Sequence, residues 1–234
     1  MIARACSRWP RGTGRSVSYD QLHHFIADGV WGSAPLEAAL LAAVDRLVGG
    51  ENAFLVIDET CLPRKGGHSV GVAPQDGSSP GKTANCQSLV SVTLASGEVP
   101  VPVMVGLRLF LPEVWTGDPD RMARARVPED RQTVLSKPEI ALGEIDRARA
   151  AAVRFGRVLA DAGYGSSGPF RQALSARGLN RAVGLSRRQN VYPADVGLVL
   201  PDSGRGRRRK YHLPDRVAVS AEQMLDAGKW RKIT

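Results

Sequence analysis

The stretch Phe54-Leu55-Val56-Ile57-Asp58-Glu59-Thr60 decides the fold of this chain. Its four leading apolar residues predict a strand that is buried on both faces and ends at Asp58. Carboxylates are costly at the end of such a strand unless they meet a favourable partner there. In an open α/β sheet, ligands and catalysis are found at the carboxyl ends of the strands. The stretch therefore predicts a strand that delivers a carboxylate to a site.

A second stretch repeats this pattern, because the residues Arg157-Val158-Leu159-Ala160 lead into Asp161. A helix predicted over Ser136–Phe155 precedes it, as a parallel crossover connection requires. Two parallel strands that each end in Asp bring two carboxylates to one sheet edge. Such a pair suits divalent cations, and two Mg²⁺ ions about 4 Å apart promote phosphodiester cleavage. The alternative for Asp161 is a turn or helix-capping residue, a role in which aspartate is common.

The rest of the chain predicts a mixed α/β protein with helices beside a sheet. Residues 19–48 are expected to be helical with a break at Trp31-Gly32, and residues 88–94 and 99–111 form a hairpin. The polar segment 75–87 predicts a loop. We expect a disordered lead-in (1–18), an N-terminal helical segment (19–50), a core domain (51–186) and a basic β-rich region (187–234).

The charge of the chain points to a polyanionic partner. The net charge is +9, and from Arg181 to Thr234 there are 12 Lys/Arg against 5 Asp/Glu. Basic surfaces gain affinity for phosphate backbones by releasing counterions, although a solvated Arg-rich surface is the alternative. The candidate DNA-binding residues are Arg64, Lys65, Lys82, Arg205, Arg207, Arg208, Arg209 and Lys210.

Cysteine content and hydropathy exclude several classes of protein. The 3 cysteines are too few and too scattered for a disulfide framework or a structural zinc site, which favours a reducing, cytoplasmic compartment. The sequence contains neither an apolar run long enough for a membrane span nor the apolar stretch of a secretory signal.

Several separate motifs, in the same order, resemble those of bacterial insertion-sequence transposases of the DDE class. They are Ile57-Asp58-Glu59-Thr60, Lys65-Gly66, Ser69–Ala73, Gly81–Gln87, Arg108–Trp115, Lys137-Pro138-Glu139 and Leu159–Gly165. The resemblance covers Gln21 to Thr234 and implies an RNase H-like catalytic core with two Mg²⁺ ions. It implies that Asp58 and Asp161 are the first two acids of the DDE triad and that the partner is double-stranded DNA. Transposases of this kind generally act as dimers, so the resemblance leaves a homodimer open.

The third acid of that family is a glutamate on a helix beyond a β-rich insertion. The resemblance implies that this chain ends within that insertion, and Glu222 matches no position of the family's motif. We therefore expect a truncated, catalytically incomplete transposase.

Two alternatives stay open. One is a transposase remnant that binds DNA without cleaving it. The other is a small-molecule phosphatase or hydrolase that uses Asp58, which would leave the Arg205–Lys210 cluster unexplained.

Overall fold

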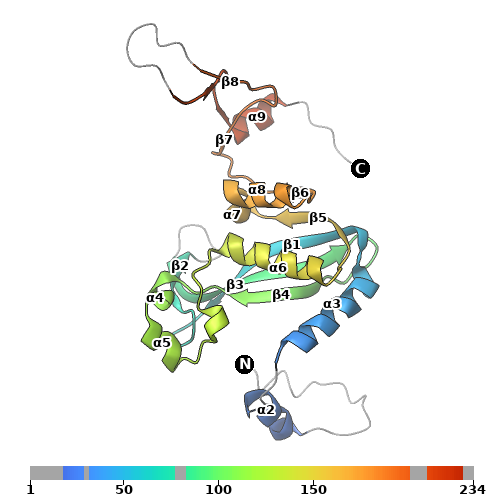
Figure 1. The fold of residues 1–234 in the computed structure, drawn as a ribbon, viewed down its shortest axis with the longest axis vertical. Helices are drawn as coiled ribbons and strands as arrows, with labels where there is room; N and C mark the ends of the chain where they lie inside the picture. The colour runs from blue at the N-terminus through green and yellow to red at the C-terminus, as the bar shows by residue number, and fades with distance from the viewer. Residues whose placement is uncertain (1–17, 29–31, 77–82, 201–209, 229–234) are drawn as a thin grey trace. The chain divides into compact units, whose positions relative to one another are not determined.

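The computed structural model describes residues 18–28, 32–76, 83–200 and 210–228. These residues form helices, a mixed sheet and two short strand pairs (Figure 1). The helices are α2 (Tyr19–Asp28), α3 (Ala34–Val48), α4 (Glu113–Thr116), α5 (Pro119–Arg124), the 3₁₀ helix η1 (Glu129–Arg131), α6 (Lys137–Ala150), α7 (Ala162–Gly165), α8 (Gly168–Ala176) and α9 (Ala221–Ala227). The main sheet contains β1 (Gly50–Pro63), β2 (Ala73–Asp76), β3 (Thr83–Ser96), β4 (Val103–Leu109), β5 (Phe155–Ala160) and β6 (Arg181–Val183).

The main sheet is antiparallel on one side of β1 and parallel on the other. β3 pairs antiparallel with β1, and both β2 and β4 pair antiparallel with β3. β5 pairs parallel with β1, and β6 pairs parallel with β5. The helix α6 lies between β4 and β5 in the sequence, so it is the crossover that a parallel pair requires. This arrangement confirms the predicted mixed RNase H-like sheet flanked by helices.

The hydrophobic core lies on one face of this sheet. Strand alternation turns Leu55 and Ile57 of β1 toward the core, together with Val90 and Val92 of β3. α6 contributes Ile145, which is fully buried, and α8 contributes further apolar side chains. Figure 1 shows α6 running across the sheet, and α6 contacts both β3 and β4.

A buried ionic cluster fastens α6 to β4. The Glu144 side chain is 7% exposed and accepts from Arg108 Nε at 2.6 Å and from Arg147 Nη2 at 2.6 Å. Arg147 Nη2 also donates to the Val105 carbonyl. A buried carboxylate of this kind is tolerated because two guanidinium groups neutralise it and satisfy its oxygens.

The chain divides into two compact units within α3, residues 1–40 and residues 41–234. The domain boundaries expected from the sequence remain a prediction. Beyond β6, β7 (Asn190–Val191) pairs with β10 (Val219–Ser220), and β8 (Leu198–Val199) pairs with β9 (Leu213–Pro214). The predicted lead-in at residues 1–17 lies outside the described residues.

Two predicted elements differ from the structure. Within the segment 75–87, expected to be a loop, residues 75–76 end β2 and residues 83–87 begin β3, because these two ends pair antiparallel as far as Asp76↔Thr83. Residues 77–82 lie outside the described residues. The helix expected to run to Phe155 ends at Ala150. There Ala152 takes a left-handed conformation (φ 56°), and the Val153 amide donates to the Ala148 carbonyl, which closes the helix before Gly156.

The ionic cluster predicts a strong dependence of stability on Glu144. The substitution Glu144→Gln removes the carboxylate charge that two partly buried arginines contact and is expected to lower the free energy of unfolding by about 3 kcal/mol. Chemical denaturation monitored by circular dichroism measures this loss. Arg149→Ala is the control, because Arg149 is 44% exposed and its 3.9 Å ion pair with Asp146 contributes less than about 1 kcal/mol. Equal losses for the two variants would contradict this account of the cluster.

Candidate active site

Asp58 lies on the face of β1 opposite the core. Leu55 and Ile57 are buried, whereas Asp58 is exposed. The backbone around it is fixed, because Asp58 is opposite Ser91 of β3 and its carbonyl accepts from Ser91 Oγ at 3.2 Å. The Asp58 Oδ1 atom accepts the Glu59 amide at 2.8 Å. A rigid strand thus presents this carboxylate to solvent.

Asp161 follows the last residue of β5 and begins α7. Its backbone is still extended (φ −74°, ψ −175°), so the alternation of the strand continues through it. Its Oδ1 accepts the Tyr164 amide at 3.2 Å, which is the contact of a helix N-cap. The capping role weighed as an alternative is therefore present, but it engages only one oxygen of an exposed carboxylate.

The parallel register of β1 and β5 brings the two aspartates to neighbouring positions. Ile57 is paired with Ala160, so Asp58 and Asp161 are the next residues on adjacent strands. Neighbouring strands lie about 4.8 Å apart, and side chains at matching positions of a parallel pair share a face. The two carboxylates therefore stand side by side on the face that points away from the core.

The sequence predicts that the strand ends at Asp58, but only the pairing of β1 with β5 ends there. Pairing with β5 stops at Ile57, but pairing with β3 continues to Pro63. β1 thus continues past Asp58 as one arm of an antiparallel ribbon. The sequence did not reveal this extension because the polar residues Asp58, Glu59 and Thr60 interrupt the apolar run that predicted the strand.

Two glycines fix the turn that carries Asp161. A Cβ added to Gly165 would lie 1.8 Å from the Gly184 carbonyl oxygen, and a Cβ on Gly184 would lie 2.7 Å from the Ala162 nitrogen. Neither position accepts a side chain without movement of α7 or of the segment after β6. Gly165 lies within one of the sequence motifs, whereas no local pattern marks Gly184, because its contact partner is distant in the sequence.

Glu59 points to the opposite face, as strand alternation predicts, and there it forms a polar cluster. Its Oε1 accepts from Lys137 Nζ at 2.5 Å, from Ser88 Oγ at 2.6 Å and from Cys61 Sγ at 3.4 Å. Burial alone would raise the pKa of Glu59, but Lys137 and Ser88 outweigh it, so the pKa lies below its ordinary value. Burial and the neighbouring Glu59 raise the pKa of the Cys61 thiol to about 11, so the thiol keeps the proton that it donates.

Tyr164 is buried close to the charges of Glu59, Asp161 and Asp58. Its ring is 3% exposed and packs against Phe170 with centroids 5.8 Å apart. Burial raises the pKa of the hydroxyl, and the charges of Glu59, Asp161 and Asp58 raise it further. Within the described residues the hydroxyl is buried without a hydrogen-bond partner. Sequence reasoning did not assign a role to Tyr164 beyond its place in the motif.

The two aspartates have the chemistry to hold a divalent cation. Both are exposed, each accepts one backbone amide, and within the described part of the chain neither joins an ion pair. Carboxylate oxygens are the ligands that Mg²⁺ prefers. Over residues 18–28, 32–76, 83–200 and 210–228, no group of three or more His, Cys, Asp or Glu side chains is placed to hold a metal ion. Glu222 lies elsewhere, in the first turn of α9, with Arg187 at 3.8 Å.

The predicted DNA-binding residues fall into three groups. Arg64 and Lys65 are exposed and directly follow the last residue of β1, and Arg64 Nε donates to Gln87 Oε1 at 2.7 Å. Lys210 is also exposed. Lys82, Arg205, Arg207, Arg208 and Arg209 lie outside the described residues.

The Glu59 cluster predicts a pH-dependent stability. Because the folded pKa of Glu59 is below its ordinary value of 4.5, its contribution to stability is present above about pH 4.5 and is lost as the pH falls through the lowered pKa. Glu59→Gln is expected to cost about 1–2 kcal/mol at pH 7 and less at pH 3. Urea denaturation of both proteins between pH 3 and pH 7 measures the difference. A loss that stays constant over this range would rule out the charged pair as its source.

None of the helices in the described ranges is long and apolar enough to cross a membrane.

No solved structure matches the chain. The DDE superfamily endonuclease family matches residues 4–234. The chain is also 29% identical over 174 residues to a protein of Microchaete diplosiphon named as the probable transposase for insertion sequence element IS701. That match covers 73% of this chain and 41% of the relative, so the chain spans less than half the length of that protein. With nearly all of its residues matched, the chain belongs to the DDE superfamily endonuclease family.

Proposed function

We propose that this protein cleaves and joins DNA strands in transposition, with Asp58 and Asp161 as its two metal-binding carboxylates. The observation that carries the proposal is the β1–β5 register, which brings two exposed aspartates together in a member of the DDE endonuclease family. The similarity to a probable insertion-sequence transposase supports DNA as the substrate. The net charge of +9 favours a polyanion in the same way.

Asp58 and Asp161 would hold divalent metal, with Mg²⁺ expected because both ligands are hard oxygens. A bound divalent cation supplies charge stabilisation and an activated water for phosphodiester cleavage. The protein's own contribution is to fix the two carboxylates. Asp58 is held by the β1–β3 ladder, and Asp161 is held by the Tyr164 amide and by the close packing of Gly165 against Gly184.

A second function is favoured by one observation. The described residues bring two acids together, and none of them supplies a third ligand at that place. A member of the family with two acids at its site would bind DNA and metal but would not cut. Cleavage and binding must therefore be measured separately.

The proposal predicts that metal binding and cleavage depend on both aspartates. Asp58→Asn and Asp161→Asn are each expected to lower cleavage of duplex DNA carrying the element's ends by more than about 100-fold, because even outer partners of metal ligands are worth about 10- to 100-fold. Asp130→Asn is the matched control, since Asp130 is an exposed aspartate in η1.

Calorimetric titration with Mn²⁺ separates the two functions. Mn²⁺ binding that both site variants abolish, without cleavage by the parent protein, would establish the non-catalytic function. Cleavage that Asp58→Asn leaves intact would exclude Asp58 as a metal ligand of the reaction. Unchanged cleavage in Asp130→Asn is required in either case.

The proposal also predicts that DNA binding weakens steeply with salt. Phosphate contacts release counterions, so the affinity for duplex DNA is expected to fall about 10-fold or more between 50 and 200 mM salt. Fluorescence anisotropy with a labelled duplex measures the slope. An affinity that does not change with salt would oppose a phosphate-binding surface and would favour a small-molecule hydrolase.

A further inference from the structure

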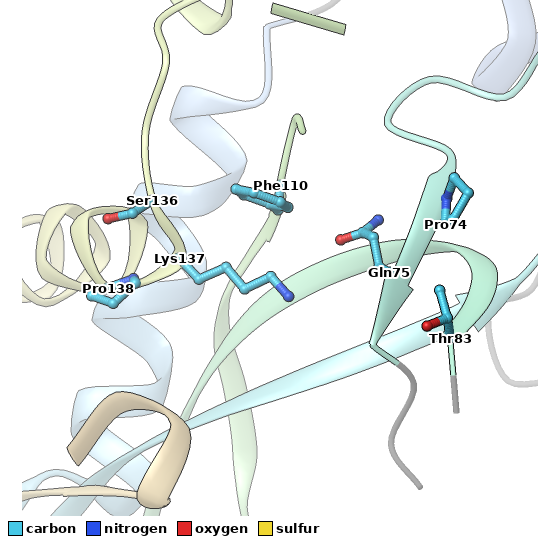
Figure 2. A pocket seen from close by; sticks show the side chains of 7 residues that line it. All are labelled: Pro74, Gln75, Thr83, Phe110, Ser136, Lys137 and Pro138. Atoms are coloured by element: carbon cyan, nitrogen blue, oxygen red, sulfur yellow. The ribbon is translucent and has the colours of Figure 1, made fainter. Parts of the chain in front are cut away.

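A pocket lies beside the Glu59 cluster, on elements that the proposed chemistry does not use. It has a volume of about 470 Å³ and is lined by residues of β2, the start of β3, the end of β4 and the start of α6. Figure 2 shows Phe110, Gln75 and Lys137 around the same space, with Pro74 and Pro138 at its sides. It is an open, shallow hollow rather than an enclosed cavity, and most of its exposed lining is apolar.

Gln75 presents an acceptor to this pocket. Its Nε2 donates to the Cys86 carbonyl at 3.0 Å and to the Gly71 carbonyl at 3.5 Å. Carbonyl oxygens only accept, so these two contacts fix which end of the amide is the nitrogen. The Oε1 atom is buried and has no partner within the described residues, and Figure 2 shows it on the side toward Phe110 and Lys137. A buried acceptor without a partner calls for an N–H donor from elsewhere.

The walls of the pocket suit a flat aromatic group. Phe110 is half-buried, and its amide donates to the Ser88 carbonyl at 2.9 Å, which fixes the backbone beneath the ring. Pro74 and Pro138 add rigid apolar surface. A planar heterocycle gains stacking energy on an aromatic ring. For a nucleobase, this gain is similar whichever base is bound, because every base has a flat π face.

The charges around the pocket argue against a phosphate as its occupant. Lys137 is the lysine of the lining, and its ammonium group is already paired with Glu59 at 2.5 Å and lies 5.1 Å from the Phe110 ring centroid. The positive charge is therefore neutralised by a carboxylate rather than held free for an anion. The remaining groups are an acceptor and apolar rings, which fit a base better than a phosphate.

We propose that this pocket binds one unpaired nucleobase of a DNA strand. The base stacks on Phe110 and donates an N–H from its edge to Gln75 Oε1. Adenine, cytosine, guanine and thymine each carry such a donor on the edge that pairing would otherwise occupy. The pocket lies on the opposite face of β1 from Asp58, because its Lys137 donates to Glu59, whose side chain points away from the two aspartates. The choice of DNA rests on the proposed function, whereas the pocket chemistry does not require cleavage.

Fluorescence of 2-aminopurine tests the proposal without added metal. The probe is a single-stranded DNA of about eight nucleotides with 2-aminopurine at its centre, a length within the usual range of single-strand sites. The parent protein is expected to bind it and to quench its fluorescence, because the base stacks on Phe110. Phe110→Leu is expected to weaken binding about 5-fold or more and to abolish the quenching. Gln75→Met is expected to weaken binding to a similar extent.

Phe155→Leu is the matched control, because it makes the same chemical change at the opposite end of β5 from Asp161. It should bind and quench like the parent. A second probe replaces the central base by an abasic site and should bind as weakly to the parent as the complete probe binds to Phe110→Leu. If Gln75→Met fails to fold, as judged by circular dichroism, Phe110→Leu and the abasic probe carry the test.

Three results would overturn the proposal: no binding of the probe by the parent, binding without quenching, or full affinity for the abasic probe or in the Phe110→Leu variant. The readout is independent of the reaction. If the protein quenches the probe through Phe110 but does not cleave DNA, the nucleobase pocket is supported and only the proposed catalysis is rejected.

Discussion

The hydrogen-bond ladder between β1 and β5 is the constraint on which the candidate site depends. Asp58 and Asp161 are about a hundred residues apart in the sequence. They become neighbours because Phe54–Ile57 of β1 pairs in parallel with Arg157–Ala160 of β5. The crossover helix α6 makes this pairing possible, and it packs against β3, β4 and α8. The site is therefore a property of backbone register more than of local side-chain packing.

The same strand separates two carboxylates into different electrostatic environments. Asp58 faces solvent beside another aspartate, within described residues that give neither of them a cation partner. Glu59 faces inward, where Lys137 neutralises its charge and the Ser88 hydroxyl donates a hydrogen bond to its carboxylate. A pair of unneutralised acids attracts a cation, whereas a neutralised acid ties α6 to the sheet. One residue step along β1 thus changes a carboxylate from a candidate ligand into a structural anchor.

Much of this arrangement was predictable because its signals are local. The apolar run before Asp58, the capping residues Ser136 and Ser220 and the glycine stop at Gly178 each act within a few residues, and the structure contains the elements they predict. The β3–β4 hairpin followed from its apolar, β-branched pattern in the same way. The expected positions of Asp58 and Asp161 at one sheet edge followed from two strand patterns and one crossover helix.

The remainder depends on contacts between distant residues, which leave no local signal. The contact of Gly165 with the Gly184 carbonyl is of this kind, and so are the bond of Lys137 to Glu59 and the unpartnered oxygen of Gln75. The polar segment 75–87 read as a loop because its side chains are polar, yet backbone pairing decides its ends. The left-handed Ala152 ended α6 early although alanine favours helices, because the turn into β5 determines the backbone there.

The strict alternation of β1 also limits how this gene can change over evolutionary time. The loops between β1 and β5 lie outside the ladder, so insertions or deletions within them leave the Ile57↔Ala160 register intact. An in-frame gain or loss of a single codon between Gly50 and Asp58 is different, because a shift of one residue exchanges the two faces of a strand. It would turn Glu59 outward and Asp58 toward Lys137. Viable length variants in this segment should therefore differ by even numbers of residues, or carry a bulge that restores the phase.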